Sequence, residues 1–408
     1  MTRGAAKVLH CGAWVCAALL FAARALAAAP DFVLADHCPP GFELAGKGVC
    51  ELRTLYQFYD SLENRGVGGT RTALPPHRDG FTPQQIDLGR YLFFDPLLSG
   101  DGTLSCASCH RPDRGLADGR PRSIGIHGQD AGRAAPTLWN VAFLHRFFWD
   151  ARADSLEAQA TGPLYSPREM GNDPARLMAS LNGNATYRRL FAQAFAQKAG
   201  TPITAQQVYT ALAAFQSSLV SLNSRYDRYV HGYDAALSER EIQGLNVFRS
   251  FVARCSECHT PPLFTNEQVA VIGVPEPKGR PFDVGAENTF HSEKLKGGFK
   301  VPTLRNIART APYMHSGTFG TLREAVDFYN QGRGHAVPKD LHLYLHWHIT
   351  DPKLTNAEVD RIVDFLHALT DETFLPQVPA RVPSGLAPLP RTQALSAAAR
   401  SGEPVRRR

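Results

Sequence analysis

Two short sequences constrain this chain more than any other feature. Residues 106–110 read CASCH and residues 255–259 read CSECH, so each has two cysteines three positions apart and a histidine directly after the second. Thiols with this spacing on one helical turn can form thioether bonds to the two vinyl groups of a porphyrin, and the next histidine can bind the iron. The sequence therefore predicts two covalent c-type haems.

Each residue of the two motifs has a predicted task. The haem attachment residues are Cys106, Cys109, Cys255 and Cys258, and the proximal iron ligands are His110 and His259. Zinc is the alternative, because cysteine and histidine also bind it, but a structural zinc site requires four ligands and each motif offers three. Two such motifs in one chain favour haem.

The first 29 residues are typical of a cleaved signal peptide. Basic residues come first, an apolar run spans residues 14–21, and small residues fill positions 25–29. A membrane anchor is the competing interpretation, but Arg24 interrupts the segment, which is shorter than the roughly 20 apolar residues that a span requires. We expect an exported, periplasmic protein without a stable membrane anchor.

Residues 30–80 are predicted to form an N-terminal extension. Cys38 and Cys50 flank a short loop rich in proline and glycine. An oxidising compartment favours a disulfide between them over the alternative of two free thiols. The Gly-, Pro- and Thr-rich stretch around residues 65–78 is typical of a linker.

The formal net charge of +6 is concentrated at the two ends of the chain. The predicted signal peptide carries three basic residues, and residues 376–408 hold six arginines and one glutamate, which leaves the middle slightly acidic. This distribution argues against nucleic-acid binding. Because residues 376–408 lack apolar periodicity, we expect a disordered basic tail.

Helix-start signals recur along the chain, while strand runs and βαβ alternation do not stand out. The signals are Thr82 before Pro83, Thr204 with Gln207, Ser238 with Glu241, Thr321 with Glu324, and Thr355 with Glu358. The haem motifs are 149 residues apart, each within its own helical region. We predict a mostly α-helical fold with two tandem cytochrome-c-like haem domains, residues 81–225 and 226–375, and long connecting loops.

Longer stretches around the motifs carry a resemblance to one family. They include LGRYLFFDPLLSGDGTLSCASCH, FFWDARADSLEAQATGPLYSPREMG and FKVPTLRNIARTAPYMHSGTFGTLREAVDFYNQG. These resemble bacterial di-haem cytochrome c peroxidases and their MauG-like relatives over about residues 81–370. The resemblance implies an enzyme that uses hydrogen peroxide as oxidant. Its partner would be a small redox protein donor, either a cytochrome c or a copper protein, or a protein substrate.

The resemblance also implies roles for three residues near the first haem. Gln159 and Glu169 align with the residues that lie over the peroxide-binding haem, and Trp149 aligns with the tryptophan that relays electrons between the haems. A carboxylate suits the reaction, because peroxide must lose a proton from one oxygen and receive one on the other. Without the resemblance, Gln159 and Glu169 would be taken as surface residues and Trp149 as a core residue.

The second haem is expected to have an unusual sixth ligand. Peroxidases place a methionine on the helix after the PYMHSG-like turn, and this chain has Tyr329 there, as MauG-like members do. A phenolate stabilises oxidised iron better than a thioether and lowers the potential. The alternatives are that Tyr329 packs in a core beside Leu322 and Val326, or that Met314 is the ligand.

Two further features of the family are open in this chain. His127 lies one residue from the position of a removable distal ligand of the first haem: if it binds, reductive activation is needed, and if not, the iron is five-coordinate. Family members also hold calcium at positions that align with Ala134, Thr310 and Pro312. Thr310 and Pro312 would contribute backbone carbonyls, whereas Ala134 lacks the side-chain oxygen of the usual asparagine.

The rival from another functional class is a non-catalytic di-haem electron-transfer cytochrome. Such a protein would keep both irons six-coordinate and inert to peroxide. The coordination of the first iron therefore separates an enzyme from a simple electron carrier.

Overall fold

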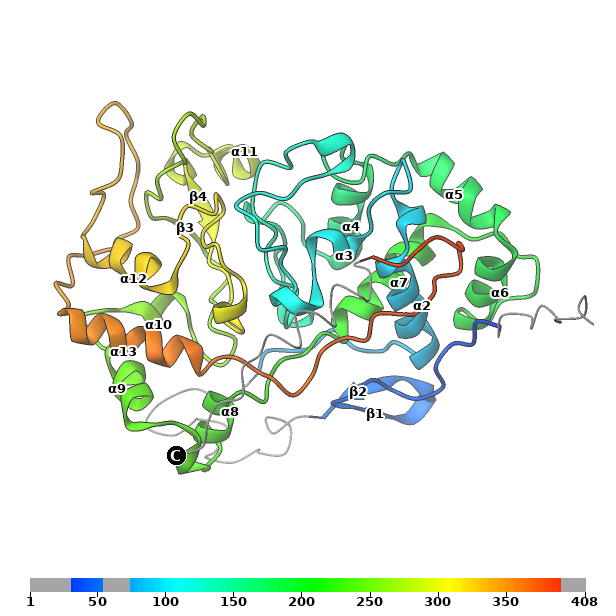
Figure 1. The fold of residues 1–408 in the computed structure, drawn as a ribbon, viewed down its shortest axis with the longest axis horizontal. Helices are drawn as coiled ribbons and strands as arrows, with labels where there is room; N and C mark the ends of the chain where they lie inside the picture. Colours follow the sequence, from blue (N-terminus) through cyan, green and yellow to red (C-terminus); the bar gives the residue numbers. More distant parts are fainter. Residues whose placement is uncertain (1–30, 54–73, 390–408) are drawn as a thin grey trace, which may run out of the picture. The chain divides into compact units, whose positions relative to one another are not determined.

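The computed structural model describes residues 31–53 and 74–389 (Figure 1). The predicted signal peptide and part of the predicted linker lie outside the described residues. Those from Leu34 onward belong to one compact unit. The haem-domain boundaries at residues 81, 226 and 375 stay predictions.

Helices dominate the described residues, as the sequence predicts. The α-helices are α2 (Pro83–Phe94), α3 (Cys106–Cys109), α4 (Leu156–Tyr165), α5 (Pro174–Gly183), α6 (Ala185–Ala194), α7 (Ala205–Ser217), α8 (Arg225–Val230), α9 (Glu239–Phe248), α10 (Cys255–Cys258), α11 (Glu287–Phe290), α12 (Leu322–Asn330) and α13 (Asn356–His367). Two antiparallel pairs of three-residue strands complete the fold: β1 (Phe42–Leu44) with β2 (Cys50–Leu52), and β3 (Val269–Val271) with β4 (Gly298–Lys300). No helix in the described part of the chain is long and apolar enough to span a membrane.

The five predicted helix starts are confirmed as capping boxes. In each, the side chain of the N-cap residue accepts a hydrogen bond from a backbone N–H three positions on, and the residue there bonds back to the N-cap backbone. The N-caps are Thr82, Thr204, Ser238, Thr321 and Thr355. These bonds satisfy backbone donors that a helix start leaves open.

Each haem motif lies in a half built around one close helix crossing. Helix α2 packs on α7 and helix α9 packs on α13 (Figure 1). Both crossings occur at a glycine: a Cβ atom on Gly89 would lie 1.8 Å from the Ala211 oxygen, and one on Gly244 would lie 1.9 Å from the Arg361 oxygen. Any larger residue would force the helices apart. The repeated crossing supports the tandem-domain prediction.

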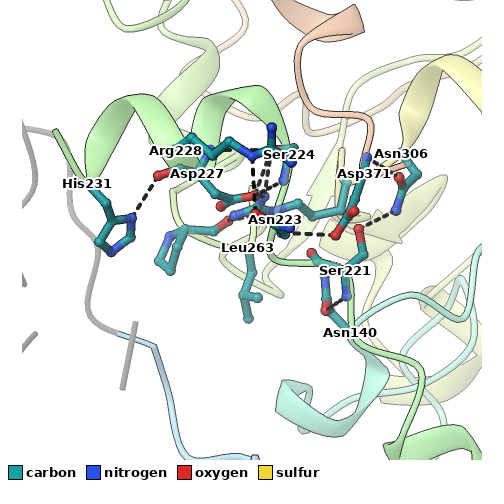
Figure 2. A network of polar contacts seen from close by, with 12 residues as sticks. Asn140, Ser221, Asn223, Ser224, Asp227, Arg228, His231, Leu263, Asn306 and Asp371 are labelled. Carbon is teal, nitrogen blue, oxygen red and sulfur yellow. Dashed lines mark hydrogen bonds and ion pairs between the residues drawn. The ribbon is translucent and has the colours of Figure 1, made fainter. Parts of the chain in front are cut away.

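A second repeat, PTLWN at residues 136–140 and PTLRN at residues 302–306, joins the two halves. The buried side chain of Asn140 forms two hydrogen bonds with the Ser221 backbone, at 2.8 and 3.0 Å. The side chain of Asn306 donates to the Ser221 hydroxyl at 2.7 Å and accepts from the Asp371 backbone (Figure 2). Ser221, in the segment between the halves, is therefore held by Asn140 of the first half and by Asn306 of the second half.

The N-terminal extension carries the predicted disulfide, which joins Cys38 and Cys50. Cys50 is the first residue of β2 and its backbone N–H donates to the Phe81 carbonyl at 2.8 Å. The ring of His77, in the predicted linker, lies edge-on to the ring of Phe143. The extension is thus packed against the first half.

The tail prediction is wrong for residues 376–389. Val382 is buried, and the Ser384 hydroxyl donates to the buried carboxylate of Asp95 at 2.6 Å. The Leu389 backbone donates to the Phe94 carbonyl, so the segment follows α2 (Figure 1). Polar bonds to a buried carboxylate hold this extended segment, and such bonds leave no periodicity in the sequence. Residues 390–408 lie outside the described residues.

Candidate haem sites

The first CxxCH motif opens onto a cavity of about 480 Å³, within the size range of cofactor sites. Cys106, Cys109 and His110 line it together with apolar residues such as Phe93 and Leu164. Neither cysteine forms a disulfide, and burial raises the pKa of both thiols to about 12. The residues present therefore fit a thioether-linked haem.

The hydrogen bonding and burial of His110 suit its predicted role as an iron ligand. Its Nδ1 lies 3.0 Å from the Leu116 carbonyl oxygen. A carbonyl only accepts, so Nδ1 carries the proton and Nε2 keeps the lone pair that a metal requires. Burial lowers the pKa of His110, which keeps the ring neutral.

The second motif repeats this arrangement. His259 Nδ1 lies 3.1 Å from the carbonyl oxygens of both Phe264 and Pro302, and burial lowers its pKa as well. Cys255 and Cys258 form no disulfide. The same tautomer is therefore favoured at both histidines.

The structure brings Gln159 and Glu169 into the first cavity. Gln159 comes from α4, and Glu169 from the loop that follows it. The Glu169 carboxylate has no hydrogen-bond partner among the described residues, and burial raises its pKa against the opposing effect of Arg152 and Arg168. A carboxyl group with a raised pKa accepts a proton more readily than an ordinary glutamate and can return it to a bound substrate.

The SIGIHG loop positions Glu169 but does not bring His127 to the cavity. The Ile126 backbone donates to the Glu169 carbonyl at 2.8 Å, and Gly125 packs so closely that a Cβ atom would lie 2.0 Å from the Arg168 oxygen. The side chain of His127 is 68% exposed and its Nδ1 lies 3.8 Å from an Asp101 oxygen. The geometry disfavours His127 as a haem ligand.

Trp149 lines the first cavity and contacts the second half. Its Nε1 donates to the Ala134 carbonyl at 2.8 Å, and its carbonyl accepts from the Lys300 backbone at 2.7 Å. Its ring lies edge-on to His315, with centroids 6.4 Å apart. Ala151, at the glycine position of the family's WDGR motif, has a φ of +60°, which explains why glycine suits this turn.

Tyr329 lies close to the second attachment site. Burial raises the pKa of its phenol, and the Cys258 and Cys255 thiols raise it further. The hydroxyl has no hydrogen-bond partner among the described residues, whereas the ring contacts Phe328. The position near both attachment cysteines suits the predicted iron ligand, and the contact with Phe328 suits the core alternative, so ligation by Tyr329 stays a prediction.

The calcium prediction gains little from the geometry. The Ala134 carbonyl is engaged by Trp149, and Thr310 uses its hydroxyl on the Ile307 carbonyl. Pro312 offers a backbone carbonyl and no side-chain oxygen. Calcium binding there stays a prediction.

Sequence reasoning missed two groups of residues. His346 and His348 lie near Cys258, with His348 Nδ1 3.9 Å from the sulfur and Nε2 2.8 Å from a Glu257 oxygen. Lys300 reaches the first cavity from the second half. The clustered histidines of LHLYLHWHITD were a visible signal for the first group; only the tertiary fold locates the second.

Two cytochrome-c-like halves with one histidine-bearing site each define a di-haem cytochrome. A profile of the di-haem cytochrome c peroxidase family matches residues 83–235. The methylamine utilization protein MauG of Methylorubrum extorquens is 34% identical over 74% of this chain and 84% of that protein. The cytochrome c551 peroxidase of Pseudomonas aeruginosa is 34% identical over 70% of this chain and 79% of that protein. The chain belongs to the family of di-haem cytochrome c peroxidases and MauG proteins, and it is a di-haem enzyme.

Solved structures agree with this assignment. A MauG-like protein associated with microbial copper homeostasis superimposes with a TM-score of 0.66 at 33% identity, over 74% of this chain and 94% of that one. The diheme peroxidase BthA from Burkholderia thailandensis gives 0.59 at 28% identity, over 87% and 99%. The mostly α-helical, tandem-haem prediction is therefore confirmed.

Proposed function

We propose that this protein is a periplasmic enzyme with two covalent c-type haems that reduces hydrogen peroxide at the first site. One observation carries the proposal: Gln159, Glu169 and Trp149 line the same cavity as Cys106, Cys109 and His110. A simple electron carrier has no need of a buried carboxyl group with a raised pKa at its haem. Hydrogen peroxide, two electrons and two protons give two water molecules.

The side chains of the first site have different roles in the proposed reaction. The haem, when bound through Cys106 and Cys109, would supply an open iron for peroxide. Glu169 accepts the proton from one peroxide oxygen and delivers it to the other, while Gln159 orients the peroxide by hydrogen bonds. Trp149, between the cavity and His315, relays electrons from the second half.

Tyr329 favours a MauG-like version, in which the oxidising equivalents are used on residues of a partner protein. Helix α12 holds no methionine, and Tyr329 lies near Cys255 and Cys258. A phenolate on the second iron would lower its potential and favour its oxidised state. The peroxidase version instead draws electrons from a small cytochrome or copper protein.

Either partner would exchange electrons near Cys258. Trp347 is 65% exposed, its ring lies 3.6 Å from that of His348, and His348 lies 3.9 Å from the Cys258 sulfur. This short aromatic path reaches from the protein surface to the second attachment site. We propose that the partner docks over Trp347.

Electron paramagnetic resonance of the oxidised, mature protein before and after peroxide tests the proposal. We expect a high-spin signal from the first haem that peroxide abolishes. Two low-spin signals that peroxide leaves unchanged would establish the electron-transfer cytochrome instead. Intact mass must exceed that of the processed chain by two porphyrins, and this measurement tests covalent attachment separately.

A further inference from the structure

Lys300 is a buried cation that faces the first cavity from the other half of the protein. It is the last residue of β4 and only 8% exposed, and it lines the cavity beside Pro302. Successive side chains of a strand point to opposite faces. Phe299 accordingly stacks on His315 at 3.7 Å, while Lys300 is directed toward the cavity.

The ammonium group of Lys300 has no hydrogen-bond or ion-pair partner among the described residues, although carboxylates lie nearby. The Glu267 carboxylate raises the pKa of Lys300, but it already accepts hydrogen bonds from the backbone N–H groups of His145 and Arg146. Asp283 is held by both arms of the Arg133 guanidinium. Both acids are thus engaged by other donors, and neither forms an ion pair with Lys300 among the described residues.

A buried ammonium without a partner is costly in free energy, because it loses its hydration and gains no ion pair. Burial does lower the pKa of Lys300, to about 8, which leaves the group mostly charged at neutral pH. An anion inside the cavity would therefore stabilise the charged side chain of Lys300.

The net charge of the side chains that line the cavity also favours a bound anion. Five cationic side chains and three acidic ones line it: Arg133, Arg146, Arg152, Arg168 and Lys300, against Asp150, Glu169 and Asp283. The excess of two positive charges matches the two carboxylates that one haem carries on its propionate groups. A haem in this cavity would neutralise the lining.

We propose that Lys300 binds a propionate carboxylate of the haem attached to Cys106 and Cys109. The second half thereby anchors the cofactor of the first half. The Lys300 backbone N–H also holds the Trp149 carbonyl, so one strand residue fixes both the haem edge and the start of the electron path. The inference rests on the haem of the proposed function and not on its peroxide chemistry.

The test is a redox titration of holoprotein carrying Lys300→Met, with Lys300→Arg as the conservative variant and Lys278→Met as a control at an exposed lysine. A nearby positive charge favours the reduced haem. Its loss should raise the oxidised-to-reduced ratio of the first haem about tenfold at a fixed applied potential. In Lys300→Met the potential of the first haem should also become pH-dependent in the range where the unpaired propionate titrates. Lys300→Arg, which keeps the positive charge, should have the wild-type potential and the wild-type pH dependence.

Three outcomes are informative. A shift confined to the first haem and rescued by arginine supports the proposal. Unchanged potentials in a Lys300→Met protein that retains both haems would overturn it while leaving the proposed function intact. Wild-type protein without haem would overturn the proposed function itself.

Discussion

The backbone N–H of Lys300 donates a 2.7 Å hydrogen bond to the carbonyl oxygen of Trp149. Two residues away, the Pro302 carbonyl lies 3.1 Å from His259 Nδ1. Residues 300–302 thus connect the tryptophan of the first cavity to the predicted proximal ligand of the second site. This short segment offers the proposed electron transfer a second connection between the sites, beside the contact of Trp149 with His315.

Replacing Trp149 with phenylalanine should slow electron transfer between the haems by at least about tenfold, because phenylalanine is much harder to oxidise and lacks the N–H that holds the Ala134 carbonyl. Stopped-flow absorbance after rapid mixing of reduced protein with peroxide measures this rate. Trp139, a buried tryptophan whose ring lies edge-on to Phe374, provides the control. Equal effects of Trp149→Phe and Trp139→Phe would refute a relay role.

The peroxide reaction should depend on pH through Glu169. Only the ionised carboxylate can accept a proton, and burial raises its pKa above the ordinary glutamate value. The rate constant for the reaction with peroxide should therefore be at its maximum above that raised pKa and should fall as the pH decreases through it. Glu169→Gln should reduce the rate about 10²- to 10⁴-fold and abolish this pH dependence. A variant with an unchanged profile would exclude Glu169 as the base.

Tyr329→Met should raise the midpoint potential of the second haem, because a thioether stabilises ferric iron less than a phenolate does. Spectroelectrochemical titration measures the change, and the potential of the first haem serves as the internal reference. Tyr329→Phe separates ligation from packing. If both variants keep the wild-type visible spectrum, Tyr329 is only a core residue.

His127→Ala should leave the spin state of the first haem and its reaction with peroxide unchanged, since the His127 side chain is exposed and paired with Asp101. Absorbance spectra of the fully oxidised and half-reduced protein provide the comparison. A change from low-spin to high-spin iron in the variant would instead identify His127 as a removable ligand.

The fully buried pair of Arg305 and Asp227 should be a large contributor to stability. Their charged atoms lie 2.7 Å apart (Figure 2 shows Asp227), and Arg305 also donates to the Pro262 carbonyl. Asp227→Ala should cost about 3–5 kcal/mol of unfolding free energy, because it leaves a buried cation uncompensated. Glu372→Ala, which breaks an exposed pair with Arg309, should cost no more than about 1 kcal/mol. Urea unfolding followed by circular dichroism measures both.

Local chemistry let the sequence determine much of this protein by itself. The capping pairs predict where α7, α9, α12 and α13 begin, because a cap is satisfied within four residues. The CxxCH spacing predicts both haem sites, since thiols and imidazole act within one helical turn. The Cys38–Cys50 disulfide was likewise predictable from a short loop in a chain with a predicted signal peptide.

Only the tertiary structure decided which distant residues share a cavity. It placed Glu169 in the same cavity as His110, turned His127 outward, bound the segment from 376 to 389 to Asp95, and brought Lys300 from the second half to the first site. None of these contacts repeats with a helical or strand period. They depend on how the two halves of one compact unit meet, and burial then decides which charges keep a partner.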